Sequence, residues 1–154
     1  MKICFIGHRN ICADEKLVSI LKETILNLIK NGATTFIFGS KSSFDNLAWE
    51  IVTELKLKFK NVKRVYVRAG NKIINKDYET YLHNFYEETY FPAKLENAGK
   101  YSYVERNYEM IEISDICVFY YDKNHLPLKR KSGTKIAYEY ALIKNKQIIN
   151  LGNV

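Results

Sequence analysis

A short run of small residues, Ser132-Gly133-Thr134, has the residue types of an anion-binding turn. It follows three consecutive positive charges at Lys129-Arg130-Lys131 and precedes apolar residues at helical spacing, at positions 136, 137, 140 and 141. The first turn of a helix leaves backbone N–H groups without partners, and these groups bind anions at the positive end of the helix dipole. The run therefore predicts a phosphate-binding turn, with a plain helix cap as the alternative.

Further polar residues follow other apolar runs directly. Gly7-His8-Arg9 follows the first run, Gly39-Ser40 follows the second, and Arg68 follows the third. Arg9 is suited to a bidentate contact with phosphate and His8 to a hydrogen bond with a ligand. The alternative for Arg9 is an ion pair with a surface carboxylate. We expect Gly7, His8, Gly39 and Ser40 to line the floor of the same site.

The elements that position these residues alternate along the chain. Strand-like runs are expected at 2–6, 34–38, 62–67, 115–121 and 147–151, and helices after Asp14, after Ser42, at about 101–113 and from Lys135. This alternation predicts one domain over residues 1–154, an α/β, Rossmann-like three-layer sandwich with a mainly parallel sheet. In such a sheet the ligand lies beyond the carboxyl ends of the strands, near the point where the strand order reverses.

The segment 69–100 is less regular and rich in Tyr and Phe between residues 78 and 91. Pro92 is expected to end any helix that precedes it. We interpret these aromatic side chains as core or subunit interface, with base stacking as the alternative for any single one.

Composition limits the class of protein. The chain of 154 residues has a net charge of +7, which suits an anionic ligand or nucleic acid, although scattered lysines also give this charge. No apolar run approaches the ~20 residues that span a bilayer. The cysteines, at 4, 12 and 117, form no Cys-x-x-Cys, which predicts a reduced, cytoplasmic protein. The histidines, at 8, 83 and 125, lack metal-ligand spacing, so no metal or other cofactor is expected.

Two standard nucleotide fingerprints, Gly-x-Gly-x-x-Gly and the P-loop, are absent from the sequence. Asp45 can bond a ribose hydroxyl, but its spacing from Ser42 favours a carboxylate at a helix start. Arg106 is unusual on a packed helix and is predicted to contact the ligand's anionic group. The alternative for Arg106 is a salt bridge with Glu105 or Glu109.

Taken in order, these pieces resemble the SLOG (SMF/DprA–LOG) superfamily in its YpsA-like branch. The matching residues are Gly7-His8-Arg9, Gly39 with Phe44-Asp45, Arg106-Asn107 with Met110, Ser114-Asp115, and Ser132-Gly133-Thr134 with Ala141. The resemblance implies a Rossmann-like fold, a pocket for nucleotides or their derivatives, and a homodimer or larger homo-oligomer. Members of that superfamily include phosphoribohydrolases, a single-strand DNA-loading protein and sensor domains of antiviral systems.

Residue by residue, the resemblance assigns Arg106 and Met110 to the hydrolases' Arg-x-x-x-Met pattern, and 132–134 to part of their phosphate loop. Their catalytic Glu corresponds to Ala137 in this chain. Glu139 lies two positions on, roughly 200° round the helix axis, and is expected to point away. Loss of that carboxylate removes the obvious group for stabilising an oxocarbenium-like centre or activating water.

The sequence thus predicts a protein that binds a nucleotide or nucleotide-derived ligand, as a sensor would, without hydrolase activity. One alternative is an N-glycosidic hydrolase that uses another carboxylate, such as Glu50, Glu105 or Glu139. A second alternative is a module that binds single-stranded nucleic acid, which the net charge also favours.

Overall fold

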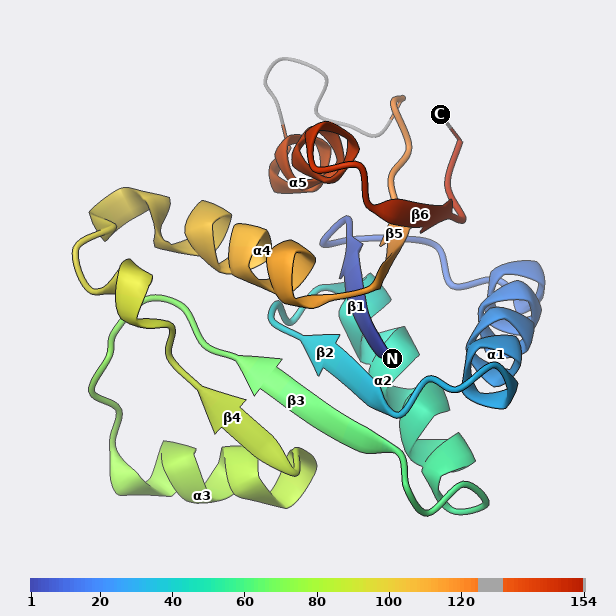
Figure 1. Ribbon diagram of the computed structural model, residues 1–154, viewed down its shortest axis with the longest axis horizontal. Coiled ribbons are helices and arrows are strands. Elements are labelled where there is room, and N and C mark those ends of the chain that lie inside the picture. Colours follow the sequence, from blue (N-terminus) through green and yellow to red (C-terminus); the bar gives the residue numbers. More distant parts are fainter. Residues whose placement is uncertain (125–131, 154) are drawn as a thin grey trace.

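The computed structural model describes residues 1–124 and 132–153, within which strands and helices alternate (Figure 1). The strands are β1 (Lys2–Gly7), β2 (Thr35–Phe38), β3 (Lys63–Val67), β4 (Glu88–Tyr90), β5 (Ile116–Tyr120) and β6 (Gln147–Asn150). The α-helices are α1 (Glu15–Lys30), α2 (Ser43–Lys56), α3 (Lys76–Phe85), α4 (Ser102–Ile113) and α5 (Gly133–Ile143). Two 3₁₀ turns precede α4, η1 (Ala93–Leu95) and η2 (Gly99–Tyr101).

In the described residues these strands form one sheet in the order β4-β3-β2-β1-β5-β6, and every neighbouring pair is parallel. The chain steps outward from β1 to β4 and then returns to the other side of β1. The strand order therefore reverses between β1 and β5. The predicted α/β, Rossmann-like arrangement with a parallel sheet is confirmed.

Helices cover both faces of the sheet (Figure 1). On one face, Ile3 and Phe5 of β1 pack in a core with side chains of α1, α2 and α3. On the other face, Cys4 and Ile6 of the same strand pack with side chains of α4 and α5. Because successive side chains of a strand point to opposite faces, β1 is buried on both sides. None of the described helices has the length and apolar character to cross a bilayer.

The helix ends follow the predicted capping chemistry. The Asp14 side chain accepts from the Leu17 backbone N–H at 2.8 Å and begins α1. Gly32 follows that helix with φ +104°, a conformation that favours glycine. The Ser42 side chain accepts from the Asp45 backbone N–H at 3.1 Å and begins α2.

The segment 69–100 is more regular than its sequence indicates. It contains α3 and β4, neither of which was predicted, and Pro92 follows β4 instead of ending a helix. Helix α3 has only one fully buried side chain among its described residues, Leu82. Strand β4 has three residues at the sheet edge, and one of them, Glu88, is exposed.

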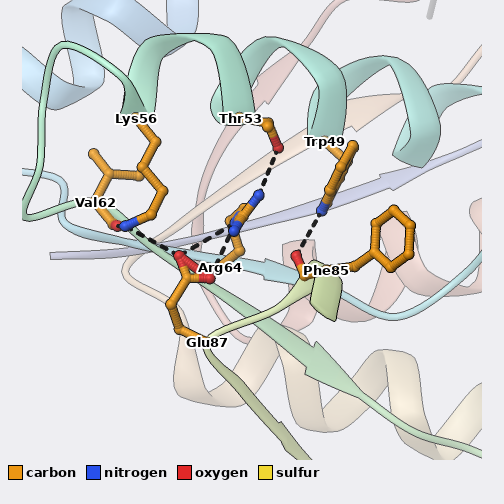
Figure 2. Close-up of polar contacts among 7 residues, drawn as sticks. All are labelled: Trp49, Thr53, Lys56, Val62, Arg64, Phe85 and Glu87. Atoms are coloured by element: carbon orange, nitrogen blue, oxygen red, sulfur yellow. Dashed lines mark hydrogen bonds and ion pairs between the residues drawn. The ribbon is translucent and has the colours of Figure 1, made fainter. Parts of the chain in front are cut away.

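A polar network fastens the α3–β4 connection to α2 at the amino end of β3 (Figure 2). The Arg64 Nε donates to both carboxylate oxygens of Glu87, at 3.2 and 3.0 Å, and its Nη1 donates to Thr53 Oγ1 at 3.0 Å. Lys56 pairs with the same carboxylate at 3.1 Å. The Trp49 Nε1 donates to the Phe85 carbonyl at 3.2 Å. These contacts hold the edge of the sheet at the end opposite the predicted ligand site.

Replacing Arg64 by alanine should lower the free energy of unfolding by about 1–2 kcal/mol, because it removes a two-pronged charged contact that is largely shielded from solvent. The Arg64 side chain is 14% exposed. The matched control is Lys22→Ala, which breaks the exposed Lys22–Glu54 pair and should cost less than about 0.5 kcal/mol. Urea unfolding measures both changes. Equal losses in the two variants would contradict a special role for the network.

Candidate functional site

Two loops flank the point where the strand order reverses. Gly7, at the end of β1, is in register with Tyr120 at the end of β5. The His8 backbone N–H donates to the Tyr120 carbonyl at 3.3 Å. Both loops therefore start at the same edge of the sheet, where open α/β folds bind ligands.

His8 joins these two loops. It is only 3% exposed, and its Nε2 accepts from the Asp122 backbone N–H at 2.9 Å. Because Nε2 accepts, a neutral ring carries its proton on Nδ1. Its ring centroid lies 5.9 Å from that of Tyr121. His8 thus holds the β1 and β5 loops together at this edge of the sheet.

Two predicted site glycines have close neighbours. A Cβ on Gly7 would lie 2.4–2.5 Å from three side-chain atoms of Phe44, in the first turn of α2. A Cβ on Gly39 would lie 2.4 Å from the sulfur of Met110 and 2.6 Å from Cδ of Arg106. Both positions therefore require glycine for packing of the helices against the strand ends.

The start of α5 is capped, and its first residue is exposed. The Ser132 side chain accepts from the Lys135 backbone N–H at 3.0 Å, as the cap interpretation predicts. Gly133 is exposed, and a Cβ there would meet no described atom within 4 Å. Thr134 is buried, at 7% exposure. The basic run at 129–131 lies outside the described residues.

Arg9 lies on the surface and contacts another element through its backbone. Its carbonyl accepts from the Ser43 N–H at 2.7 Å, which ties the β1 loop to the start of α2. The residue itself is exposed, so the guanidinium is accessible from solvent.

Asp45, in the first turn of α2, carries a buried carboxyl group that contacts the loop after β2. It is 2% exposed, and its Oδ2 accepts from the backbone N–H groups of Gly39, at 3.3 Å, and Ser40, at 3.0 Å. Its Oδ1 is buried and has no hydrogen-bond partner among the described residues. Burial raises the pKa of Asp45 to about 7, while the two N–H donors and the positive charge of Arg106 act in the opposite direction. The position at a helix start was predicted from the sequence, whereas the contacts with the Gly39–Ser40 loop were not.

Arg106 reaches the same place from α4, on the other face of the sheet. It is 4% exposed, and its Nη1 donates to the Gly39 carbonyl. Its Nε donates to the Asn107 Oδ1 at 3.0 Å, and its guanidinium carbon lies 5.7 Å from the ring centroid of Tyr103. Burial lowers its pKa, and the nearby Asp45 charge raises it. These partners differ from the neighbouring glutamates considered as alternatives, and they bring Arg106, Gly39 and Ser40 together around Asp45.

The predicted residues thus form two groups at one edge of the sheet. The first comprises the β1 loop and the start of α5, and the second surrounds Asp45. Ala137 belongs to neither group, because its side chain is fully buried in the core between α5 and the sheet. Glu139 is half-buried on the same helix. Among the described residues, no three His, Cys, Asp or Glu side chains are arranged to hold a metal ion.

Two cavities lie in the part of the structure that contains the loop after β3 and helix α3. One of about 210 Å³ opens at the end of β3 and is lined by Tyr66, Tyr78 and Tyr103 among others. Another of about 290 Å³ lies beside α3 and includes Thr89. Both include Arg68, and neither is lined by any of the predicted ligand residues. Of these lining residues, Tyr78 belongs to the tyrosine-rich segment 78–91 and Arg68 directly follows the third strand, whereas Tyr66 and Tyr103 carried no such signal.

Comparison with known proteins gives one family. A model described as the YspA SLOG family matches residues 11–152. A search of the curated proteins gave no match.

Proposed function

Because the chain belongs to the YspA SLOG family, we propose that it binds a nucleotide or nucleotide-derived ligand at the carboxyl ends of its strands. The observation that carries this proposal is the position of the β1 loop and the start of α5 on either side of the strand-order reversal. Loops from the two ends of the chain lie next to each other there, so the folded chain brings residues that are distant in the sequence into one place.

The phosphate of the ligand would lie at the start of α5. Gly133, the first residue of that helix, is exposed, and anions bind the N–H groups at such helix starts. Arg9 supplies an exposed guanidinium that suits a bidentate phosphate contact. Arg106 would act through the Gly39–Ser40 loop that it bonds, because it is buried.

The absence of hydrolase chemistry is part of the proposal. At Ala137, where the related hydrolases carry their Glu, the side chain is enclosed by apolar residues. Asp45 is the buried carboxyl group nearest the strand ends, but its Oδ2 is occupied by two backbone N–H groups. We therefore assign the protein a binding or sensing role.

A thermal-shift screen against nucleotides, ADP-ribose and cyclic nucleotides tests this function. A bound ligand at 100 times its Kd adds about 2.7 kcal/mol, which should raise Tm by roughly 5–10 °C for a chain of this size. We expect Arg9→Ala and Gly133→Asp to abolish the shift. Lys30→Ala, at the far end of α1, serves as the control and should retain it.

A different outcome of this screen would contradict the proposal. If no nucleotide raises Tm, and the protein instead binds single-stranded DNA with an affinity that falls steeply with salt, then the nucleic-acid alternative replaces this proposal.

A further inference from the structure

The cavity at the end of β3 has aromatic walls from three elements. Tyr66 comes from β3, Tyr78 from α3 and Tyr103 from the first turn of α4. The Gly70 backbone N–H donates to Ser102 Oγ at 2.8 Å, which ties the loop after β3 to the start of α4. The walls are therefore held in place by the fold.

The charges around this cavity favour a ligand without positive charge. Its described lining includes one cation, Arg68, and no carboxylate. The Arg68 guanidinium donates to the carbonyls of Asn71, at 3.1 Å, and Lys72, at 3.2 Å, which fixes its position. Two more cations lie over the tyrosine rings, Lys41 at 5.0 Å from Tyr78 and Arg106 at 5.7 Å from Tyr103.

The cavity is large enough for one ring of a ligand but too small for a whole nucleotide. Its volume of about 210 Å³ is below the ~300–1,000 Å³ of sites that enclose a whole drug-sized molecule. It suits a single flat ring system. Aromatic side chains and arginine planes stack on nucleic-acid bases through their π faces, independently of sequence.

The cavity also lies at a suitable distance from the proposed phosphate position. Only β2 separates β3 from β1, the strand before Arg9, so these two strand ends are about 10 Å apart, and β5, the strand before α5, lies about 5 Å further on. The Gly39–Ser40 loop, held by Asp45, lies between them. A ligand with a ring at one end and a phosphate at the other would cross this loop.

We propose that the cavity lined by Tyr66, Tyr78 and Tyr103 holds the heteroaromatic ring of the ligand, a purine or pyrimidine base, stacked on Tyr103. This inference rests on the function proposed above, and it assigns a binding site to the base of the same ligand. Tyr103 is the wall best suited to a test, because it is 62% exposed and can be removed without opening the core.

The test is calorimetric titration of the four ribonucleoside monophosphates, and of ribose phosphate, into the wild type and three variants. Tyr103→Ala should weaken binding of the tightest nucleotide about 5–100-fold, because stacking contributes roughly 1–3 kcal/mol per base. Tyr103→Phe should bind like the wild type. Tyr101→Ala is the matched control, since Tyr101 is 59% exposed one position before α4 and should have no effect. Affinity for ribose phosphate should be the same in the wild type and Tyr103→Ala.

The titrations distinguish an error in the base site from an error in the proposed function. If the wild type binds nucleotides and Tyr103→Ala binds them as tightly as Tyr101→Ala, the base site is wrong and the proposed function stands. If the wild type binds neither nucleotides nor ribose phosphate, or binds only single-stranded oligonucleotides, both proposals are wrong.

Discussion

The free energy of unfolding should fall by on the order of 4 kcal/mol, through Asp45 alone, as the pH rises from about 4 to about 7. Burial raises the pKa of this carboxyl group from 3.8 to about 7 in the folded protein. Each unit of difference corresponds to about 1.36 kcal/mol. Because the folded pKa is the higher one, the folded state binds the proton more tightly, and its stabilisation is complete below pH 4 and lost above pH 7.

Urea unfolding of the wild type and Asp45→Asn at pH 4.5 and pH 8 measures this effect. Asparagine keeps an oxygen for the Gly39 and Ser40 N–H groups but cannot ionise. Relative to the wild type, the variant should therefore be more stable at pH 8 than at pH 4.5, by most of the predicted difference. Other titrating groups contribute equally to both proteins and cancel. Parallel stabilities at the two pH values would show that Asp45 stays ionised throughout.

Replacement of Gly7 by alanine should lower the free energy of unfolding by about 3 kcal/mol. The added Cβ would lie 2.4–2.5 Å from Phe44, including 2.5 Å from that residue's own Cβ. Because a Cβ is fixed to the backbone, the first turn of α2 would have to move away from β1. Phe44 is fully buried, so this movement would disturb the packing of the core around it.

Gly133→Ala is the control for this substitution. The same methyl group there meets nothing within 4 Å, and alanine loses less entropy on folding than glycine. Its stability should be unchanged or higher by up to about 1 kcal/mol. Thermal unfolding monitored by circular dichroism compares both variants with the wild type. A Gly7→Ala protein as stable as Gly133→Ala would mean that α2 adapts without cost.

Much of the fold could be predicted because local chemistry and pattern agree. Asp14, Gly32 and Ser42 mark helix ends by their own capping chemistry, and the apolar runs between them have strand or helix spacing. Helix α3 and strand β4 were missed because each buries few side chains. Helix α3 has a single buried leucine, and β4 pairs only at the sheet edge. The order of strands depends on packing between distant segments, which no local pattern contains.

For the candidate site residues, the sequence predicted the edge of the sheet at which they lie better than it predicted their contacts. Residues directly after apolar runs lie at one edge of the sheet because the strands are parallel. The link between Asp45 and Arg106 was not apparent, since it crosses from one face of the sheet to the other through the Gly39 loop. Burial changes the pKa of both residues, and because burial exists only in the folded chain, the sequence did not indicate these changes. The ligand assignments themselves stay predictions.

The pairing of β1 with β5 also governs how the chain assembles. Lys2 and Asp115, joined by a hydrogen bond at the start of these strands, are 113 positions apart. During synthesis, β1 can pair with β2 early, but its second edge stays open until almost the whole chain has emerged. Such distant pairing slows folding, and an open strand edge invites pairing with other molecules. A chain that ends before β5 would leave one edge of β1, a strand buried on both faces, open to aggregation.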